Sequence, residues 1–142
     1  MLVSEILRIK GNTLYTTGPG DTVRASVRVM TELDIGSQVV MDQGKLVGML
    51  TFREVLAVLD RQDGVLANTK VGAVMESDPL TTDSHMEVME LRGKMLERHS
   101  RYVPVMDGAT LLGVVSFHDV AKAMYEEQSF ENTMLKDYIA AA

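Results

Sequence analysis

One pattern of apolar and polar positions occurs twice along the chain. The segments "GMLTFREV" (residues 48–55) and "GVVSFHDV" (residues 113–120) share one order: glycine, two apolar residues, a hydroxyl residue, phenylalanine, a basic or imidazole residue, an acid and valine. When these are superposed, segments 14–55 and 79–120 align without a gap and are identical at 12 of 42 positions. Unrelated segments would share roughly two or three identities, so the chain contains an internal duplication.

Each copy predicts a β-α-β-β-α unit, and the fold class is therefore α+β. The short β-prone pieces "LYTT" and "PLTT" precede helices whose N-caps we assign to Asp21 in the first copy and to Asp83 or Ser84 in the second. Two apolar runs joined by a turn that contains glycine then predict a β-hairpin, and a second helix begins at Phe52 or Phe117. The apolar stripe of the first helix is Val23, Val27 and Met30 in one copy and Met86, Met89 and Met95 in the other.

The repeat also predicts the domain organisation. We expect repeat 1 over residues 1–62, a polar linker over 63–70, repeat 2 over 71–126 and a C-terminal helix over 127–142. The C-terminal helix should be buried on the module or on a dimer partner, because large apolar side chains recur in it at helical spacing. These side chains are Phe130, Met134, Leu135, Tyr138 and Ile139.

Composition narrows the function classes. With 46% hydrophobic and 24% charged residues, the chain has the composition of a soluble globular protein. No secretory leader and no apolar run of membrane-spanning length is visible, so we expect a mature, soluble, cytoplasmic protein without a membrane partner. The net charge of −6 argues against nucleic-acid binding. The lack of cysteine excludes disulfides, thiolate metal sites and a cysteine nucleophile.

A known family matches the residues of the repeat. The order "V-x-x-V-M … T-T … R-Y-V-P-V-M-D … L-x-G-V-V-S-F-H-D-V" resembles the CBS domain, and the doubled copy resembles a CBS pair, or Bateman module, as in small stand-alone bacterial two-CBS proteins. The resemblance covers residues 1 to about 125. It implies two repeats packed about a pseudo-twofold axis, a homodimer, and clefts that take AMP, ADP, ATP, NAD or S-adenosylmethionine. It implies a regulatory role in signal transduction through an unknown effector protein, and AMP suits the few basic residues best.

The resemblance also implies a main ligand site around the second "S-F-H-D" segment. A carboxylate accepts hydrogen bonds from both ribose hydroxyls, so Ser116 and Asp119 would bracket the ribose and the α-phosphate at a helix N-terminus. His118 either adds a donor near the phosphate or is solvated. In the family a cleft combines this pair with the "TT" segment and hairpin strand of the other copy. Here those residues are Thr16, Thr17, Ile35, Gly36, Ser37 and Val39.

The equivalent site of the first copy is expected to be weaker or empty. Glu54 stands where the family usually has aspartate, and its extra methylene moves the carboxylate by about 1.5 Å. Arg101 would either bind phosphate in a fork or form a surface salt bridge. The members of this second site are Thr51, Arg53, Glu54, Thr81, Thr82, Arg101, Tyr102 and Val103.

Simpler alternatives remain open for the same residues. A hydroxyl residue followed three positions later by an acid is also a capping box, which needs no ligand. The chain would then be a degenerate CBS pair that serves as a protein-interaction or dimerisation module. We expect no enzyme, since no catalytic motif is present. We also expect no metal site, since His85 and His99 lack ligand spacing.

Overall fold

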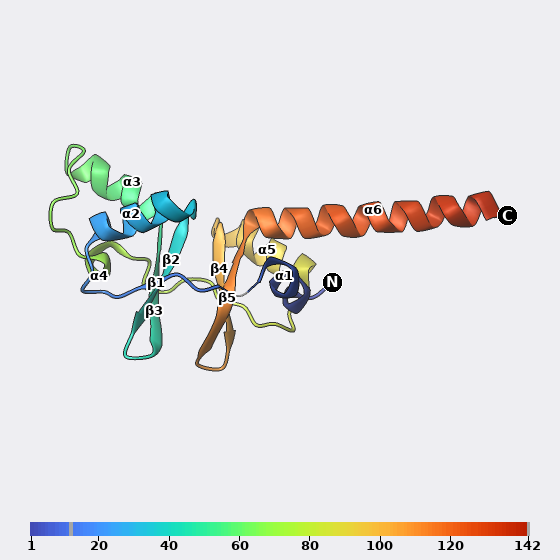
Figure 1. The fold of residues 1–142 in the computed structure, drawn as a ribbon, viewed down its shortest axis with the longest axis horizontal. Coiled ribbons are helices and arrows are strands. Elements are labelled where there is room, and N and C mark those ends of the chain that lie inside the picture. The colour runs from blue at the N-terminus through green and yellow to red at the C-terminus, as the bar shows by residue number, and fades with distance from the viewer. Residues whose placement is uncertain (12, 142) are drawn as a thin grey trace. The chain divides into compact units, whose positions relative to one another are not determined.

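The chain forms two compact units in the computed structural model, which describes residues 1–11 and 13–141 (Figure 1). Unit 1 consists of Met1–Asn12, Leu80–Asp107 and Leu112–Ala142. Unit 2 consists of Thr13–Pro79 and Gly108–Leu111. Each unit has its own buried cluster of aliphatic side chains, one around Val88, Leu91 and Val115 and the other around Val23 and Leu50.

Unit 2 contains a three-stranded sheet in the order β1-β2-β3. Its strands are β1 (Thr16–Thr17), β2 (Ser37–Asp42) and β3 (Lys45–Thr51). Strand β1 runs parallel to β2, and β2 runs antiparallel to β3. Gln43 and Gly44 connect the hairpin with φ angles of 50° and 78°, the pair of positive values that a tight hairpin turn requires. The helices are α2 (Val23–Leu33), α3 (Phe52–Arg61) and α4 (Val71–Val74).

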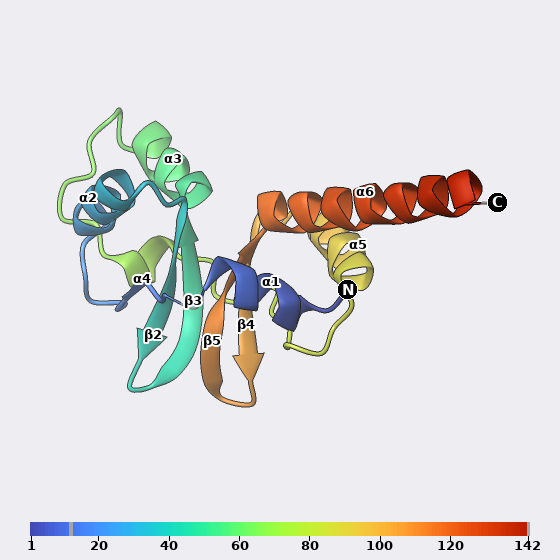
Figure 2. The same cartoon turned by 45° about the vertical axis from the view of Figure 1, so that its right-hand side comes forward.

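Unit 1 contains a second hairpin, made of β4 (Tyr102–Asp107) and β5 (Thr110–Ser116). Thr82 forms a parallel bridge to Val105 and so takes the place that β1 has in unit 2. The helices α1, α5 and α6 of this unit lie around the β4–β5 hairpin (Figure 2). Their bounds are α1 (Val3–Lys10), α5 (Val88–Arg98) and α6 (Phe117–Ala141).

The structure confirms the duplication and the predicted β-α-β-β-α order. Helices α2 and α5, strands β2 and β4, and strands β3 and β5 all match in the alignment of the two copies. One tertiary hydrogen bond is repeated as well: the Phe52 amide donates to the Gly36 carbonyl at 3.2 Å, and the Phe117 amide donates to the Arg101 carbonyl at 2.8 Å. The two copies therefore fold to the same local geometry with different side chains.

The segments that precede the two copies are exchanged between the units. Helix α1 precedes the first copy in sequence but packs with the second: the Val3 amide donates to the Met86 carbonyl, and the Val88 amide donates to the Met1 carbonyl, both at 2.9 Å. Helix α4 precedes the second copy but belongs to unit 2, where Met49 and Glu76 exchange two backbone hydrogen bonds of 2.9 Å. The packing units thus cross the boundaries of the sequence repeat.

The predicted helix caps are wrong in detail. Thr22, not Asp21, is the N-cap of α2, and its side chain accepts the Ala25 amide at 3.1 Å. Helix α5 begins at Val88 after Glu87, so neither Asp83 nor Ser84 caps it. The buried face also differs from the predicted stripe, because Val88, Leu91 and Met95 are buried and Met89 is exposed. In both copies the helix begins later than its polar loop suggests, which local residue preferences do not reveal.

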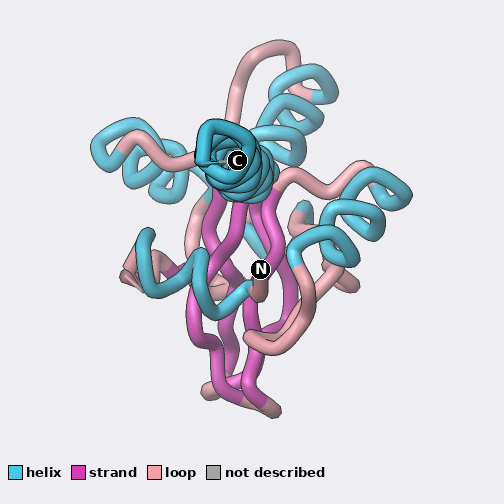
Figure 3. The backbone as a smooth tube through the Cα atoms, turned by 90° about the vertical axis from the view of Figure 1, so that its right-hand side faces the viewer, coloured by secondary structure: helices cyan, strands magenta, loops and turns pink. Residues whose placement is uncertain are grey.

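The C-terminal segment is the continuation of α6 and not a separate helix. Figure 3 looks along this helix from its C-terminal end. Val120 and Ala123 are buried, but the side chains from residue 128 to residue 141 are exposed. No helix in the described part of the chain is long and apolar enough to span a membrane.

Candidate functional site

The candidate site of unit 1 is the junction where β5 ends and α6 begins. The Ser116 amide donates to Asp119 Oδ2 at 2.9 Å, and the Asp119 amide donates to Ser116 Oγ at 3.0 Å. These reciprocal bonds form a capping box, the arrangement that the sequence predicted as an alternative to a ligand site. The cap fixes the position of the carboxylate, whose side chain is 18% exposed.

Lys10 also lies at this junction, and no motif in the sequence points to it. Its Nζ donates to Asp119 Oδ2 at 2.6 Å and to the Val114 carbonyl at 2.9 Å. Lys10 is the last residue of α1, so the exchanged N-terminal helix supplies a cation to the second copy. The repeat alignment could not have found it, because α1 lies outside the aligned segments.

The contacts of Asp119 decide its charge. Burial raises the pKa of the Asp119 carboxyl, but the hydrogen bonds from Lys10 and the Ser116 amide, together with the Lys10 charge, outweigh burial and hold the pKa below its ordinary value of 3.8. The carboxylate is therefore ionised at neutral pH. An ionised carboxylate accepts hydrogen bonds only, and hydroxyl groups are suitable donors for it.

The equivalent junction in unit 2 is built differently. The Glu54 side chain folds back on the N-cap residue, and its Oε1 accepts both the Thr51 amide at 2.7 Å and the Thr51 hydroxyl at 2.8 Å. Thr51 Oγ1 in turn accepts the Arg53 amide at 3.2 Å. Among the described residues, no salt bridge reaches Glu54. The longer Glu54 side chain is thus held by hydrogen bonds to the N-cap residue of its own helix and not by a cation.

Residues of the predicted main site fall in both units. Ser116, His118 and Asp119 lie at the start of α6 in unit 1. Within unit 2, β1 pairs with β2 so that Thr16 lies opposite Val39, while Ser37 and Val39 are buried. The Thr17 hydroxyl donates to Asp21 Oδ2 at 3.0 Å. The unit 2 members are Thr16, Thr17, Ile35, Gly36, Ser37 and Val39.

Residues of the predicted second site are divided in the same way. Thr51, Arg53 and Glu54 lie together at the start of α3 in unit 2. Thr82 is buried in unit 1, where its amide donates to the Pro104 carbonyl and its carbonyl accepts the Met106 amide. The other unit 1 members are Thr81, Arg101, Tyr102 and Val103. Over residues 1–11 and 13–141, no three histidine, aspartate or glutamate side chains are grouped so that they could hold a metal ion.

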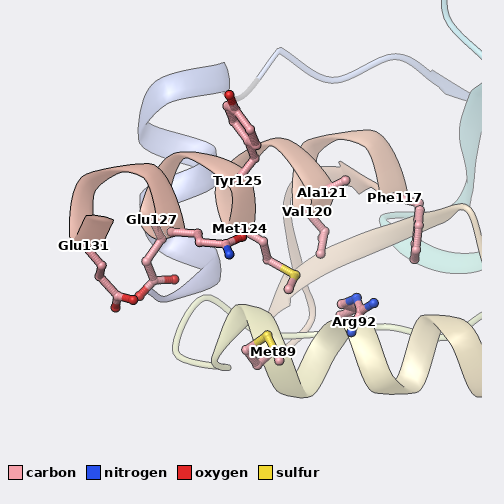
Figure 4. A pocket seen from close by; sticks show the side chains of 10 residues that line it. Met89, Arg92, Phe117, Val120, Ala121, Met124, Tyr125, Glu127 and Glu131 are labelled. Atoms are coloured by element: carbon pink, nitrogen blue, oxygen red, sulfur yellow. The ribbon is translucent and has the colours of Figure 1, made fainter. Parts of the chain in front are cut away.

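A groove lies between α5 and α6 in unit 1 (Figure 4). It has a volume of about 590 Å³. Met89 and Arg92 project into it from α5, and Phe117, Val120 and Met124 line it from α6, with Glu127 and Glu131 at its far end. The groove combines apolar walls with charged ends, which is typical of a surface that receives an amphipathic helix.

The chain is a tandem-repeat module, because its two units share one arrangement of strands and helices and each has an equivalent junction between a strand and a helix. The family model of the CBS domain matches residues 3–61 and 71–126, and the chain therefore belongs to the CBS domain family. The CBS domain-containing protein CBSX3, mitochondrial, of Arabidopsis thaliana is 30% identical over an alignment of 147 positions, and the alignment covers 96% of this chain and 71% of that protein.

Solved structures share the fold. The CBS-domain containing protein ATU1752 from Agrobacterium tumefaciens superposes with a TM-score of 0.83 at 26% identity, over 87% of this chain and 99% of that one. The structure of CBSX2 in complex with AMP has a TM-score of 0.69 at 22% identity, over 81% of this chain and 90% of that one. These matches identify a CBS pair that spans nearly the whole chain.

Proposed function

We propose that this chain is a regulatory module that binds an adenosine-containing ligand at the junction of β5 and α6. One observation carries the proposal: the Asp119 carboxylate is held ionised and in place at a helix start, where the Ser116 amide and Lys10 Nζ both donate to its Oδ2. A ribose would donate one of its two hydroxyls to each carboxylate oxygen. The complex of CBSX2 with AMP supports this ligand class through the shared fold.

The phosphate would lie at the first turn of α6. The Phe117 and Asp119 amides are used inside the protein, by the Arg101 carbonyl and by Ser116 Oγ. Among the described residues, no loop carbonyl and no side chain accepts the His118 amide, which lies at the positive end of the helix dipole. One open amide and one imidazole suit a single phosphate, so AMP is the favoured ligand over ADP, ATP, NAD or S-adenosylmethionine.

The test of this function is ligand protection of the folded state. Ligand that binds only the native state must raise the melting temperature. We expect AMP to raise the melting temperature of the wild type and not that of Asp119→Asn, which keeps the shape of the side chain but removes its charge. Glu54→Gln is the matched control and should keep the shift. Before the assay, bound nucleotide is removed and checked by absorbance, and the absence of any shift with all five ligands would reject the proposal.

A second function, dimerisation through α6, is favoured by the exposed apolar residues of that helix. Phe130, Leu135, Tyr138 and Ile139 are 58–75% exposed. Helical residues that make no tertiary contacts gain little stability by themselves, so such a segment is expected to find a partner. If no ligand binds, this interaction role alone would describe the module.

The sequence of α6 favours a second copy of the chain, packed antiparallel, as that partner. Seam positions recur at alternating steps of four and three residues, which is the spacing of a two-helix coiled coil. If two antiparallel copies of α6 cross between residues 129 and 130, each seam residue lies opposite a residue of the other copy. The resulting pairs combine a small residue with a large one, two apolar residues, and an amide with a carboxylate. The pairs are Ala121 with Tyr138, Met124 with Leu135, and Gln128 with Glu131.

Charge agrees with the antiparallel arrangement. The last turn of α6 has no basic residue of its own. In the antiparallel register this turn would reach the Phe117 end of the partner's α5–α6 groove, which Arg92 lines (Figure 4). A guanidinium beside the carbonyls of a helix C-terminus is favourable. The central Gln128 and Glu131 pair would fix the register, since polar residues in a seam select one alignment.

Cysteine cross-linking tests this dimer, because the natural chain contains no cysteine. We expect a mixture of Met124→Cys and Leu135→Cys chains to form a mixed disulfide on mild oxidation, while each variant alone does not. A parallel seam would reverse the result, since each variant would then cross-link to itself. A monomer by light scattering, without any cross-link, would contradict the interaction role.

A further inference from the structure

Lys10 joins the end of α1 to the candidate ligand site. Its Nζ bonds Asp119 Oδ2 and the Val114 carbonyl at 2.6 and 2.9 Å, so two acceptors at the end of β5 and the start of α6 hold one ammonium group. Lys10 is 41% exposed and Asp119 is 18% exposed, so the pair lies at the surface of unit 1, with the carboxylate on its inner side. The last turn of α1 is thereby fastened to the second repeat just before Gly11.

The contact with Lys10 occupies a hydrogen-bond acceptor site of the Asp119 carboxylate that a ribose would need. A carboxylate has about four acceptor sites, two on each oxygen. The Ser116 amide and Lys10 Nζ fill the two sites of Oδ2. A ribose diol that bonds both carboxylate oxygens therefore requires one of these donors to leave. The Ser116 amide is fixed in the capping box, whereas Lys10 is a flexible side chain, so Lys10 is the donor that can be displaced.

In the described part of the chain, a lysine pairs with the carboxylate at the β5–α6 junction, and no salt bridge is formed by Glu54 at the β3–α3 junction. The segments before the copies align with Val3 on Val71, which places Asp78 at the position equivalent to Lys10. An aspartate there offers Glu54 no cation, and Glu54 folds onto Thr51 instead. Helix α4 also ends at Val74, whereas α1 continues to Lys10. The cation at Asp119 is thus a specific addition to the second copy.

We propose that Lys10 competes with the ribose diol of the ligand for the Asp119 carboxylate and so sets the affinity of the site. The inference rests on the proposed nucleotide-binding function. In the free protein the ammonium occupies the carboxylate, and ligand binds only to the fraction of molecules in which Lys10 has moved away. The apparent dissociation constant is the intrinsic one divided by that fraction.

The structure provides a second position for the displaced ammonium. Lys10 and Asp119 line a cavity of about 190 Å³ between α1 and α6, together with Ile6, Lys122 and Glu126. Glu126 forms no salt bridge with another described residue, so its carboxylate is available to Lys10 across this cavity. The exchange of Asp119 for Glu126 would keep the lysine paired while it frees the ribose site.

The experiment compares the affinity of AMP for the wild type, Lys10→Met and Lys122→Met by calorimetry. Methionine keeps the length and apolar stem of lysine but cannot donate to the carboxylate. We expect Lys10→Met to bind AMP about two- to fivefold more tightly, the range that corresponds to a partly exposed ion pair. Lys122→Met removes a positive charge from the same cavity without touching Asp119, and it should bind like the wild type. The gain should vanish with 2′,3′-dideoxy-AMP, which lacks the diol.

The outcomes separate this inference from the proposed function. If the wild type binds AMP and Lys10→Met binds it equally or more weakly, Lys10 is a neutral residue or a ligand contact, and the competition is refuted while the function stands. An equal gain in Lys10→Met and Lys122→Met would assign the effect to net charge and would also refute it. If neither the wild type nor Lys10→Met binds AMP, the proposed function fails and the inference fails with it.

Discussion

Asp34 and His99 end equivalent helices in the same left-handed conformation, with φ angles of 52° and 53°. A residue other than glycine in this region carries a steric cost of roughly 1–2 kcal/mol, because its Cβ approaches the following carbonyl. Aspartate and histidine differ in size and charge, although both are enriched in this region relative to other non-glycine residues, and the backbone is the same. The conformation is therefore imposed by the fold of the repeat, which has to turn the chain from helix to strand at this point.

Asp34→Gly is expected to stabilise the protein. Glycine removes the steric cost of the left-handed conformation. It also makes the unfolded chain more flexible, which destabilises the folded state by about 0.5–1 kcal/mol. The net gain in the free energy of unfolding is therefore up to about 1 kcal/mol. Urea denaturation followed by circular dichroism measures the change. Asp34→Val should lose about 1 kcal/mol or more, since a β-branched residue fits this region worst.

The matched control for Asp34 is Glu32→Gly, two residues earlier in the same helix. Glu32 is exposed and helical, so glycine there should cost about 0.5–1 kcal/mol. Equal effects of Gly at positions 32 and 34 would show that the conformation at Asp34 is not constrained by the fold.

Gly48 and Gly113 are equivalent in the repeat, but alanine is expected to be far more harmful at Gly48. A Cβ at Gly48 would come within 2.6 Å of Met75 Sδ and 2.7 Å of the Glu76 carbonyl oxygen. That carbonyl accepts the Met49 amide, so the backbone bridge would have to move. A Cβ at Gly113 meets the end of the flexible Leu7 side chain at 2.8 Å.

For these two variants we expect a loss of roughly 2–4 kcal/mol for Gly48→Ala and about 1 kcal/mol or less for Gly113→Ala. Thermal unfolding of the two single variants side by side provides the comparison. The double variant Gly113→Ala with Leu7→Ala should recover part of the Gly113→Ala contact strain but lose the packing of Leu7. A larger effect at Gly113 than at Gly48 would contradict the assignment of the rigid contact to the first copy.

Alanine substitutions of Thr22, the N-cap of α2, and of Ser26 within α2 are expected to change the free energy of unfolding in opposite directions. Thr22 caps the helix through the Ala25 amide, so Thr22→Ala should cost about 1 kcal/mol. Ser26 is 1% exposed and no described residue forms a hydrogen bond with its Oγ, so Ser26→Ala should be neutral or stabilising by about 1 kcal/mol. Chemical denaturation of both variants tests the pair. A loss above about 1 kcal/mol for Ser26→Ala would mean that a water bonds its hydroxyl.

The repeat made the fold predictable from the sequence, because two copies of one pattern constrain each other. The hairpins and the starts of α3 and α6 followed from the positions of Gly48 and Phe52 and of their equivalents. The exchange of α1 and α4 did not follow, because a short apolar segment carries no information about which of two similar surfaces it will cover. Lys10 was hidden for the same reason: its partner Asp119 is 109 residues away, and no local spacing links them.

The pH dependence of stability is expected to report on the Lys10–Asp119 pair directly. The folded-state pKa of Asp119 lies below its ordinary value of 3.8. A carboxyl group with a lowered folded pKa contributes stability that is fully present above the unfolded pKa and is lost as the pH falls through the folded pKa. The difference in the free energy of unfolding between the wild type and Asp119→Asn should therefore be constant from neutral pH to about pH 5 and should shrink below about pH 4.

Lys10→Met should change this profile, because it removes the strongest donor to the carboxylate and leaves burial opposed by Ser116 alone. We expect the Asp119 pKa to rise in Lys10→Met, so the acid-dependent loss of stability should be smaller than in the wild type and should be complete at a higher pH. Carbon-detected NMR of the side-chain carboxyl follows the pKa without any ligand. Because the pair is partly exposed, Lys10→Met should lower the free energy of unfolding at pH 7 by less than about 1 kcal/mol. An unchanged Asp119 titration in Lys10→Met would mean that the ammonium does not occupy the carboxylate in solution.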